Sequence, residues 1–336
     1  MQQELISTIK NKIILVTGGT GSFGKTFVKE ILNHEPREVI VFSRDEAKQG
    51  TMRLEYAGEH RLRFILGDVR DYKSLREAVR GIDIIIHAAA LKWVTEAEYN
   101  VWEAVRTNVF GTQNVILAAK EENIEKVVSL STDKAVQPIN AYGMTKAIQE
   151  RLITTANLYE TNIKTIFVST RYGNVLGSCG SVVPLFKSLI SDLKPLTITD
   201  PNMTRFVLTL QESVELVLAA LKDGVGGEIF VKKMPAHTIT TLAEIMLRNV
   251  LNKTIINIGI RPGEKIHETL ISSSESSRTV KMGEFFVILP EIEMPAILEK
   301  YGDMMRLQEP RYSSDNAKQL SSEELMQILK SENYLS

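Results

Sequence analysis

The residues best suited to catalysis stand in two neighbouring segments, Ser131–Lys134 and Tyr142–Lys146. The first closes an apolar run that predicts a buried strand, and the second opens a helical pattern. Tyr142 and Lys146 are four positions apart, so they share one helix face and the ammonium can lie beside the phenol. The tyrosine phenol has a reference pKa of about 10, and a nearby positive charge lowers it by favouring the phenolate. We therefore expect Tyr142 to act as a general base toward an alcohol, the proton-transfer half of a hydride transfer.

Asp133 and Lys134 add an acid and a base of opposite character at the end of the same strand. Simple alcohol oxidation has no use for this second pair, whereas elimination of water needs both an acid and a base. The alternative is a pair of solvated loop residues. The combination favours an enzyme that both oxidises and dehydrates.

Composition narrows the class of protein. The chain has 336 residues, of which 43% are hydrophobic and 24% charged, as is typical of an enzyme with a sizeable core. Its 40 Lys and Arg nearly balance 41 Asp and Glu, which argues against nucleic acid or an anionic membrane as a partner. No apolar run has the length of a transmembrane helix, and the N-terminus lacks the pattern of a signal peptide.

The single cysteine, Cys179, excludes an internal disulfide and fits a reducing compartment. Five scattered histidines give no cluster with metal-ligand spacing, so we expect no metal site. These features predict a cytoplasmic enzyme.

Short apolar runs alternate with amphipathic stretches in the first half of the chain. The runs predict strands at Ile13–Thr17, Val39–Phe42, Arg63–Leu66, Asp83–His87, Val127–Ser131 and Thr165–Thr170. The stretches between them predict helices that include Lys25–Leu32, Tyr72–Val79 and Ala104–Glu122. Continuous apolar strands that alternate with helices are typical of a parallel sheet covered on both faces.

The pattern changes after about Gly173. We expect a helix at Leu185–Leu193, short strands near Leu196–Ile198 and Phe206–Leu210, and then an amphipathic helix. The predicted class is therefore α/β. A doubly wound parallel Rossmann sheet would occupy residues 1–173, and a smaller C-terminal substrate-binding α/β domain would occupy 174–336. In one alternative, residues 228–231 return as a strand to the first sheet.

A glycine-rich loop follows the first predicted strand and leads into a helix. Gly18, Gly21 and Gly24 permit a tight turn, close approach to a pyrophosphate and close helix packing. The helix N-terminus would offer N–H groups to the phosphates. Because strand, loop and helix agree, we prefer a dinucleotide site to a simple turn. The predicted contacts are Gly18, Thr20, Gly21, Ser22, Phe23 and Gly24.

The end of the second strand should meet the adenosine ribose. Ser43 and Arg44 suit a 2′-phosphate and favour NADP, with Lys48 as a further contact, whereas Asp45 could accept the 2′-hydroxyl of NAD. The remaining predicted cofactor contacts are Asp68 and Val69 at the adenine and Ala88 and Ala89 along the cofactor, where the alternative for either Ala is close helix packing.

Taken together, these motifs resemble those of the extended short-chain dehydrogenases/reductases. More narrowly, the chain resembles the soluble UDP-N-acetylglucosamine 4,6-dehydratases that invert C5 on the route to pseudaminic acid and related sugars. The matching segments span most of the chain: Thr17–Gly24, Phe42–Asp45, Gly67–Asp71, His87–Lys92, Ser131–Ala135, Pro138–Lys146, Arg171–Pro184, Thr199–Phe206 and Arg261–Glu268.

The resemblance implies a role for each residue of the two opening segments. Tyr142 would take the C4 hydroxyl proton while hydride passes to NADP, and Thr132 would hydrogen-bond the C4 oxygen. Lys134 would abstract the C5 proton if its amine is neutral, a state that burial favours. Asp133 would protonate the departing C6 hydroxyl before hydride returns to C6, and Lys146 would hold the nicotinamide ribose and tune Tyr142.

On the substrate side, the resemblance implies an anionic UDP-sugar. Arg205 and Arg261 would pair its diphosphate, and Glu264 a ribose hydroxyl. The alternative for either Arg is a surface cation. The other predicted substrate contacts are Lys92, Asn174, Ser181, Val182 and Tyr312. A homo-oligomer is expected, either a dimer or a larger assembly such as a hexamer.

The chain departs from the family pattern at two places. The family usually has Ser-Arg-Gly where this chain has Ser178-Cys179-Gly180, and Trp93 follows Lys92 where His or Gln is usual. Both departures bear on the choice of sugar nucleotide.

Two other functions compete with dehydration. A UDP-hexose or UDP-N-acetylhexosamine 4-epimerase needs the Tyr-Lys pair but has no task for Asp133 and Lys134. A non-catalytic NADP(H)-binding sensor has no need of Tyr142 and Lys146.

Overall fold

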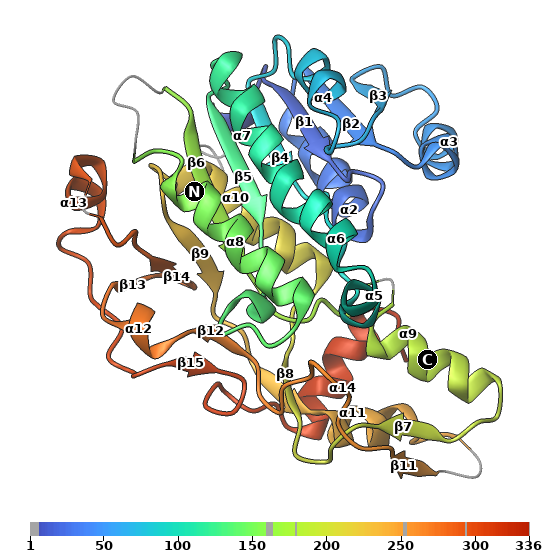
Figure 1. Ribbon diagram of the computed structural model, residues 1–336. Helices are drawn as coiled ribbons and strands as arrows, with labels where there is room; N and C mark the ends of the chain where they lie inside the picture. The colour runs from blue at the N-terminus through green and yellow to red at the C-terminus, as the bar shows by residue number, and fades with distance from the viewer. Residues whose placement is uncertain (1–6, 159–163, 179, 251–253, 293, 336) are drawn as a thin grey trace.

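The computed structural model describes residues 7–158, 164–178, 180–250, 254–292 and 294–335. Its centre is a nine-stranded sheet in the order β13-β14-β9-β6-β5-β4-β1-β2-β3 (Figure 1). Only β13 and β14 at one edge run antiparallel to their neighbours. The strands are β1 (Ile13–Thr17), β2 (Glu38–Ser43), β3 (Leu62–Leu66), β4 (Ile84–His87), β5 (Lys126–Leu130), β6 (Ile166–Arg171), β9 (Ile229–Lys232), β13 (Thr279–Met282) and β14 (Phe285–Ile288).

Helices cover both faces of this sheet because its strands are apolar on both sides. Ile14 and Val16 face one core, whereas Leu15 between them faces the other. The first face is covered by α2 (Ser22–Ile31), α10 (Leu210–Asp223) and α13 (Pro295–Tyr301), and the second by α4 (Tyr72–Ala78), α7 (Gly111–Glu121) and α8 (Ala141–Thr155). The prediction of a doubly wound Rossmann-type α/β sheet is confirmed.

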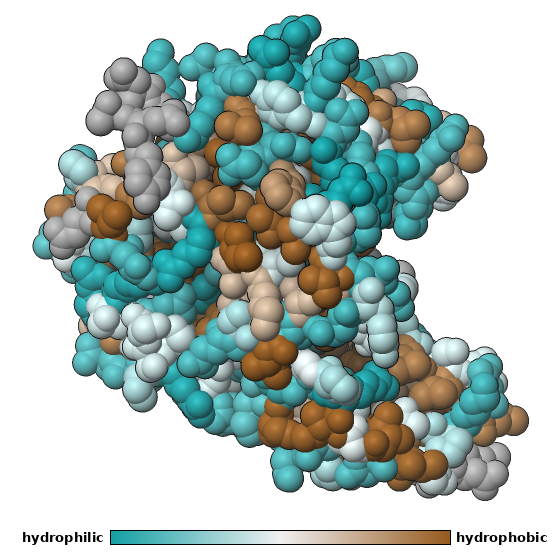
Figure 2. Space-filling model, viewed as in Figure 1, coloured by the Kyte–Doolittle hydropathy of each residue, from teal (hydrophilic) through white to brown (hydrophobic). Residues whose placement is uncertain are grey.

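A smaller lobe lies below the sheet in Figure 1, around a separate apolar core. Figure 2 shows that the surface is notched between this lobe and the rest of the molecule. Past residue 174, the described elements outside the central sheet and its covering helices are β7 (Leu196–Ile198), β8 (Thr204–Phe206), α9 (Val182–Ser191), β10 (Ala236–Thr238), α11 (Ile239–Met246), β11 (Ile255–Asn257), β12 (Thr269–Ile271), α12 (Ser273–Ser276), β15 (Tyr312–Ser313) and α14 (Ser322–Ser331).

The chain returns to the central sheet after residue 174. β9 pairs in parallel with β6, and β14 and β13 extend the sheet beyond it. A strand was expected to reach Leu210, but β8 ends at Phe206 and Leu210 begins α10. The reason is a capping box in which Thr209 and Glu212 satisfy each other's backbone N–H groups.

The long helix expected at Ala104–Glu122 is interrupted. It divides into α6 (Val101–Ala104), a π-helical segment (Val105–Phe110) and α7, and α3 (Glu46–Glu55), α5 (Val94–Tyr99) and the 3₁₀ turns η1 (Leu32–His34) and η3 (Asp133–Ala135) complete the described helices. Asn108 in the π segment bonds both the N–H and the carbonyl of Leu91, at 2.9 and 3.0 Å. A π-bulge of this kind is typical of functional sites. Among the described residues, no helix is both long and apolar enough to cross a bilayer.

Candidate active site

The end of β5 carries an acid and a base in direct contact. Asp133 is fully buried, and its Oδ1 accepts hydrogen bonds from Thr132 Oγ1 and Lys134 Nζ, both at 2.9 Å. The turn is fixed because the Asp133 N–H donates to the carbonyl of Tyr172 on the neighbouring strand end. The structure therefore places Thr132, Asp133 and Lys134 in contact with one another, in a largely buried turn and not in a solvated loop.

Lys134 also meets a second carboxylate. Its Nζ lies 3.3 Å from Glu268 Oε1, and the Glu268 side chain is buried. Burial disfavours the ammonium, but Asp133 and Glu268 outweigh it and raise the pKa of Lys134 above its ordinary value. The expectation that burial leaves this amine neutral is corrected, because two carboxylates hold its proton.

The two carboxyl groups respond in opposite directions. Burial raises the pKa of Asp133, and the charge of Glu268 raises it further against the opposing effect of Lys134. Burial would raise the pKa of Glu268 too, but Lys134 and Arg205 outweigh it and lower it. Asp133 is therefore the member of the pair more easily protonated, which suits a general acid.

The phenol of Tyr142 lies beside this cluster, near the start of α8. Burial raises its pKa to about 12, while the Lys134 ammonium and a hydrogen bond with Thr132 act to lower it. Lys146 instead donates to the Leu130 carbonyl at 2.5 Å and to Gln149 Oε1 at 2.6 Å, and burial lowers its pKa to about 7. Lys134, and not Lys146 as expected, is thus the cation that favours the Tyr142 phenolate.

The start of α8 is held close to the acid–base turn. Asn140 caps the helix by accepting from Gly143 N–H at 2.7 Å and donates to the Gly263 carbonyl at 2.8 Å. A Cβ on Gly143 would lie only 2.2 Å from the Lys134 carbonyl oxygen. Glycine at this position allows the helix to approach the turn.

Gly143→Ala should therefore separate Tyr142 from Lys134 and destabilise the protein. We expect it to cost roughly 1–3 kcal/mol, as overpacking does, and to lower turnover as well. Gly50→Ala in α3 is the matched control, because a Cβ there meets no atom within 4 Å and should be neutral or stabilising. Thermal unfolding and turnover of both variants check this, and equal behaviour of the two would contradict the packing argument.

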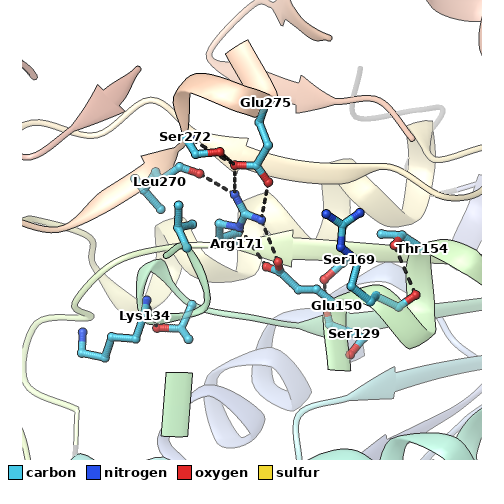
Figure 3. A network of polar contacts seen from close by, with 12 residues as sticks. Ser129, Lys134, Glu150, Thr154, Ser169, Arg171, Leu270, Ser272 and Glu275 are labelled. Atoms are coloured by element: carbon cyan, nitrogen blue, oxygen red, sulfur yellow. Dashed lines mark hydrogen bonds and ion pairs between the residues drawn. The ribbon is translucent and has the colours of Figure 1, made fainter. Parts of the chain in front are cut away.

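A buried ion cluster ties α8 to the C-terminal part of the chain (Figure 3). Arg171 at the end of β6 donates to Glu150 of α8 at 2.8 and 2.7 Å and to Glu275 of α12 at 3.1 and 2.9 Å. It also donates to the Leu270 carbonyl. Because breaking such a buried cluster leaves a charge uncompensated, Arg171 fixes three elements around the acid–base turn.

The glycine loop has the geometry of a phosphate cradle. Gly18 has φ +66°, and a Cβ there would lie 2.8 Å from the Ala89 backbone nitrogen. A Cβ on Gly24 would meet Gly19 Cα at 2.5 Å, so the helix packs tightly on the loop. In the described structure no side chain caps α2 and its first turn has no acidic residue, so its N–H groups remain available for an anion. These features fit a dinucleotide pyrophosphate.

The ribose side of this loop carries cations. Thr20 and Ser43 hydroxyls bond each other at 2.9 Å. Asp45 caps α3 through the Lys48 N–H and pairs with Lys48 Nζ at 2.8 Å, so both its oxygens are occupied. The half-exposed Arg44 lies 3.6 Å from Asp68. Two cations, Arg44 and Lys48, thus lie beside the end of β2, each close to a carboxylate.

The other predicted cofactor residues lie along the same edge of the sheet. Ser22 begins α2, and Phe23 stacks on Phe27 within that helix. Val69 is buried, and Ala88 and Ala89 line the far side of the glycine loop, where their backbone approaches Gly18.

Two of the residues predicted to contact substrate have unsatisfied polar side-chain atoms in the described structure. Asn174 Oδ1 and Ser181 Oγ are buried without a hydrogen-bond partner among the described residues. Ser181 holds the N-cap position of α9, but its hydroxyl makes no capping hydrogen bond. Unpaired buried polar atoms are costly, which suggests that a ligand completes them. Cys179 lies outside the described residues.

Arg205 was predicted to bind the diphosphate, but in the structure its guanidinium binds backbone carbonyls. Its guanidinium donates to the carbonyls of Thr204 and Ile266 at 2.7 and 3.0 Å and to that of Lys265 at 2.9 Å. It is buried, and Nε lies 3.9 Å from Glu268. This geometry anchors the 261–268 segment against β8 and gives Arg205 a structural task.

Tyr312 likewise has a structural task, because its hydroxyl donates to the Met234 carbonyl at 2.7 Å and accepts from the Met234 N–H at 2.8 Å. Arg261 and Lys92 are exposed, and the Glu264 carboxylate accepts from the Arg261 N–H. Trp93 packs against Gly180, where a Cβ would lie 2.9 Å from the indole nitrogen.

Sequence reasoning missed several residues of this site. Glu268 was not predicted as a site residue, although an acidic residue that closely follows Lys265 and His267 was a usable signal. Gln149 and Asn108 were not singled out, yet Gln149 accepts from Lys146 and Asn108 donates to Thr145 at 3.0 Å. Their roles depend on long-range packing that no local pattern indicates.

The sequence and the fold of the chain are similar to those of known proteins. Residues 14–290 match a family described as "Polysaccharide biosynthesis protein". A "UDP-N-acetylglucosamine 4,6-dehydratase (inverting)" from Campylobacter jejuni subsp. jejuni serotype O:23/36 (strain 81-176) is 45% identical over 95% of this chain and 97% of its own length.

Two further matches bear on the alternatives. A protein named "UDP-glucose 4-epimerase" from Rickettsia bellii (strain RML369-C) is 43% identical over 97% of each chain. The X-ray structure of Pen from Bacillus thuringiensis superposes with a TM-score of 0.91 at 38% identity, covering 98% of this chain and 99% of that one. Similarity alone therefore points to nucleotide-sugar chemistry and leaves two reactions to be separated by the site.

Proposed function

The chain belongs to the polysaccharide biosynthesis protein family, and from this premise we propose that it dehydrates UDP-N-acetylglucosamine at C4 and C6 with inversion at C5. The product would be UDP-2-acetamido-2,6-dideoxy-L-arabino-hex-4-ulose, which makes the protein a hydro-lyase. The observation that carries this proposal is the buried Asp133–Lys134 pair beside Tyr142. An epimerase has no use for this acid–base pair, whereas elimination of water across C5 and C6 requires it.

Each residue has a defined task in this reaction. Tyr142 takes the proton of the C4 hydroxyl, and Thr132, already bonded to the phenol, holds the C4 oxygen. Lys134 removes the C5 proton that the neighbouring ketone acidifies, and Asp133 protonates the departing C6 hydroxyl. Lys134 becomes the base by passing its proton to Asp133 Oδ1 across 2.9 Å, which prepares acid and base in one step.

The cofactor in this proposal is tightly bound NADP. When bound, it accepts hydride from C4 and returns it to C6, so it is regenerated in each turnover. The glycine loop at Gly18–Gly24 and the N-terminus of α2 would hold its pyrophosphate. Ser43, Arg44 and Lys48 would hold the 2′-phosphate.

NADP preference should depend on Arg44. Arg44→Ala removes a charged hydrogen bond to a 2′-phosphate and should weaken NADP binding roughly 10- to 100-fold while changing NAD binding little. Arg53→Ala is the matched control, since Arg53 lies near the end of the adjoining helix α3, over the ring of Phe64. Calorimetric titration of cofactor-free protein with each dinucleotide measures the ratio, and an equal loss for both would refute the assignment.

The reaction itself is tested by incubating the protein with UDP-N-acetylglucosamine and following the sugar by proton NMR. Dehydration gives a new methyl group at C6 and loss of the C4 proton. The competing 4-epimerase, which the Rickettsia relatives bring into consideration, would keep the C6 hydroxymethyl group and only invert C4. The appearance of the epimer without a methyl signal would overturn the proposal.

We also propose a homo-oligomer. Tyr99, Trp102 and Phe110 on adjoining helical segments are 83%, 63% and 51% exposed, and Trp102 packs edge-on against Phe110. Exposed aromatic clusters of this kind mark association surfaces. Light scattering after size-exclusion chromatography measures the assembly directly.

A further inference from the structure

Glu268 is held rigidly next to the acid–base turn although none of the roles above uses it. It is 2% exposed. Its backbone is clamped on both sides, because its N–H donates to Ser314 Oγ at 2.9 Å and its carbonyl accepts from the Ser314 N–H at 2.8 Å. One carboxylate oxygen faces Lys134 at 3.3 Å, and the other has no hydrogen-bond partner among the described residues.

Lys134 consequently lies between two buried carboxylates. Asp133 Oδ1 is 2.9 Å from the ammonium and Glu268 Oε1 is 3.3 Å from it. Asp133 Oδ2, like Glu268 Oε2, has no hydrogen-bond partner in the described structure. A buried carboxyl group without a full set of partners is unstable as an anion. Lys134, Asp133 and Glu268 therefore share one proton.

The proposed reaction needs this proton in a particular place. In the ion pair it is on Lys134, whereas elimination starts with Asp133 protonated and Lys134 neutral. The two states differ by one transfer, in which an N–H bond of Lys134 breaks and an O–H bond forms on Asp133. No other reactant is required, and elimination then restores the ion pair, since Lys134 gains the C5 proton and Asp133 loses its own to water.

We propose that Glu268 is a positioning residue for this reaction, which holds the Lys134 amine against Asp133 and keeps the shared proton within that pair. This proposal rests on the proposed function. The negative charge of Glu268 stabilises the ammonium and opposes a second anion on Asp133. Both effects oppose loss of the shared proton, and neither selects which member of the pair carries it.

Other charged and titratable groups surround this triad and must be considered. Arg205 of β8 approaches Glu268 at 3.9 Å, and His237 lies opposite Arg205 on β10. Lys265 donates to the Val136 carbonyl at 2.5 Å, and Tyr142 faces Lys134 from α8. Burial lowers the pKa of His237 to about 4, so it stays neutral near pH 7. The positive charge of Arg205 disfavours the Lys134 ammonium, and the negative charge of Glu268 offsets this effect.

Glu268→Gln tests the proposal because it keeps the shape and removes the charge. We expect the Lys134 amine to lose its proton about one to three pH units lower than in the wild type. Protein labelled with ¹³C at the lysine Cε, titrated by NMR, measures this, and the Lys134 signal is assigned by its absence in Lys134→Arg. The basic limb of the pH–rate profile should move to lower pH in the same direction. An unmoved Lys134 titration in folded Glu268→Gln would overturn the proposal.

Glu275→Gln is the matched control for a purely structural role. Glu275 is also a buried glutamate, but it pairs with Arg171 and not with Lys134. It should lower thermal stability without moving the Lys134 titration. Because the titration needs no substrate, it tests Glu268 even if UDP-N-acetylglucosamine is not turned over.

Glu268→Asp covers the case in which Glu268→Gln does not fold. The aspartate keeps the charge but withdraws it by one methylene from Lys134. The Lys134 titration should then lie between those expected for the wild type and for a neutral residue, and turnover should fall. Wild-type titration together with wild-type turnover would overturn the proposal.

Discussion

Tyr142→Phe should reduce turnover of UDP-N-acetylglucosamine by roughly 10²- to 10⁴-fold while the protein stays folded. The hydroxyl is the base that we propose for the C4 proton, and phenylalanine keeps the packing of the ring against Ala97 and Ala104. Burial raises the pKa of Tyr142 to about 12, so the phenol depends on Lys134 and Thr132 to lose its proton and reach the phenolate form that accepts a proton from substrate. Single-turnover measurements of C4 oxidation would localise the defect.

A second tyrosine separates chemistry from stability. Tyr301 in α13 is fully buried and its hydroxyl donates to the Asp223 carbonyl and to Glu228. Tyr301→Phe should cost about 1 kcal/mol of stability, as the loss of buried hydrogen bonds does, with normal turnover. If well-folded Tyr142→Phe turned over as fast as Tyr301→Phe, the proposed base would be wrong.

Six strands of the central sheet, β1 to β6, could be predicted from the sequence because they are short and mainly apolar runs. β9 was predicted only as an alternative at 228–231, and β13 and β14 were not predicted. Ile13–Thr17 was predicted to the residue, and the other predicted strands of this sheet are displaced by about one residue at their ends. The π segment at Val105–Phe110 could not be predicted, since Asn108 stabilises it through the backbone of Leu91, far away in the chain. Periodicity reports which face is buried and carries no information on such a contact.

The candidate site shows the same division between local and distant information. The spacing of Tyr142 and Lys146 correctly indicates one helix, but a shared face does not fix where a flexible ammonium ends. Lys146 reaches the Leu130 carbonyl, and the cation beside the phenol comes from the preceding turn. The protonation of Lys134 was misjudged for a related reason, because Glu268 approaches it from more than a hundred residues away in sequence.

Lys134→Ala should abolish elimination, because that step needs Lys134 as its base. It should slow oxidation at C4 without abolishing it, because the charge of Lys134 favours the Tyr142 phenolate but Lys134 takes no proton in that step. The variant should reduce some bound NADP on addition of substrate, seen as near-ultraviolet absorbance of the reduced cofactor, and form no methyl group. It will also lose stability, since Asp133 and Glu268 are left buried without their cation.

Lys134→Arg is therefore the sharper variant. It supplies a cation to both carboxylates, but a guanidinium is not deprotonated in proteins and cannot serve as the base. We expect it to fold more stably than Lys134→Ala and to remain unable to eliminate. Turnover by Lys134→Arg near the wild-type rate would mean that position 134 contributes only a positive charge, and that the C5 base lies elsewhere.

The stereochemistry at C5 gives the most specific test of the inverting assignment. With inversion, the proton that reaches C5 comes from a solvent-exchangeable donor on the face opposite to Lys134, so wild-type turnover in D₂O should place deuterium at C5. The proposed product has C5 inverted, which proton NMR coupling constants around the ring distinguish from the retained isomer. Inversion requires that the new proton reach C5 from the face opposite to Lys134, because return from the same amine would restore the original configuration. A product with retained C5 configuration would refute the inverting assignment, and an inverted product without deuterium would show that the donor on the opposite face does not exchange with solvent.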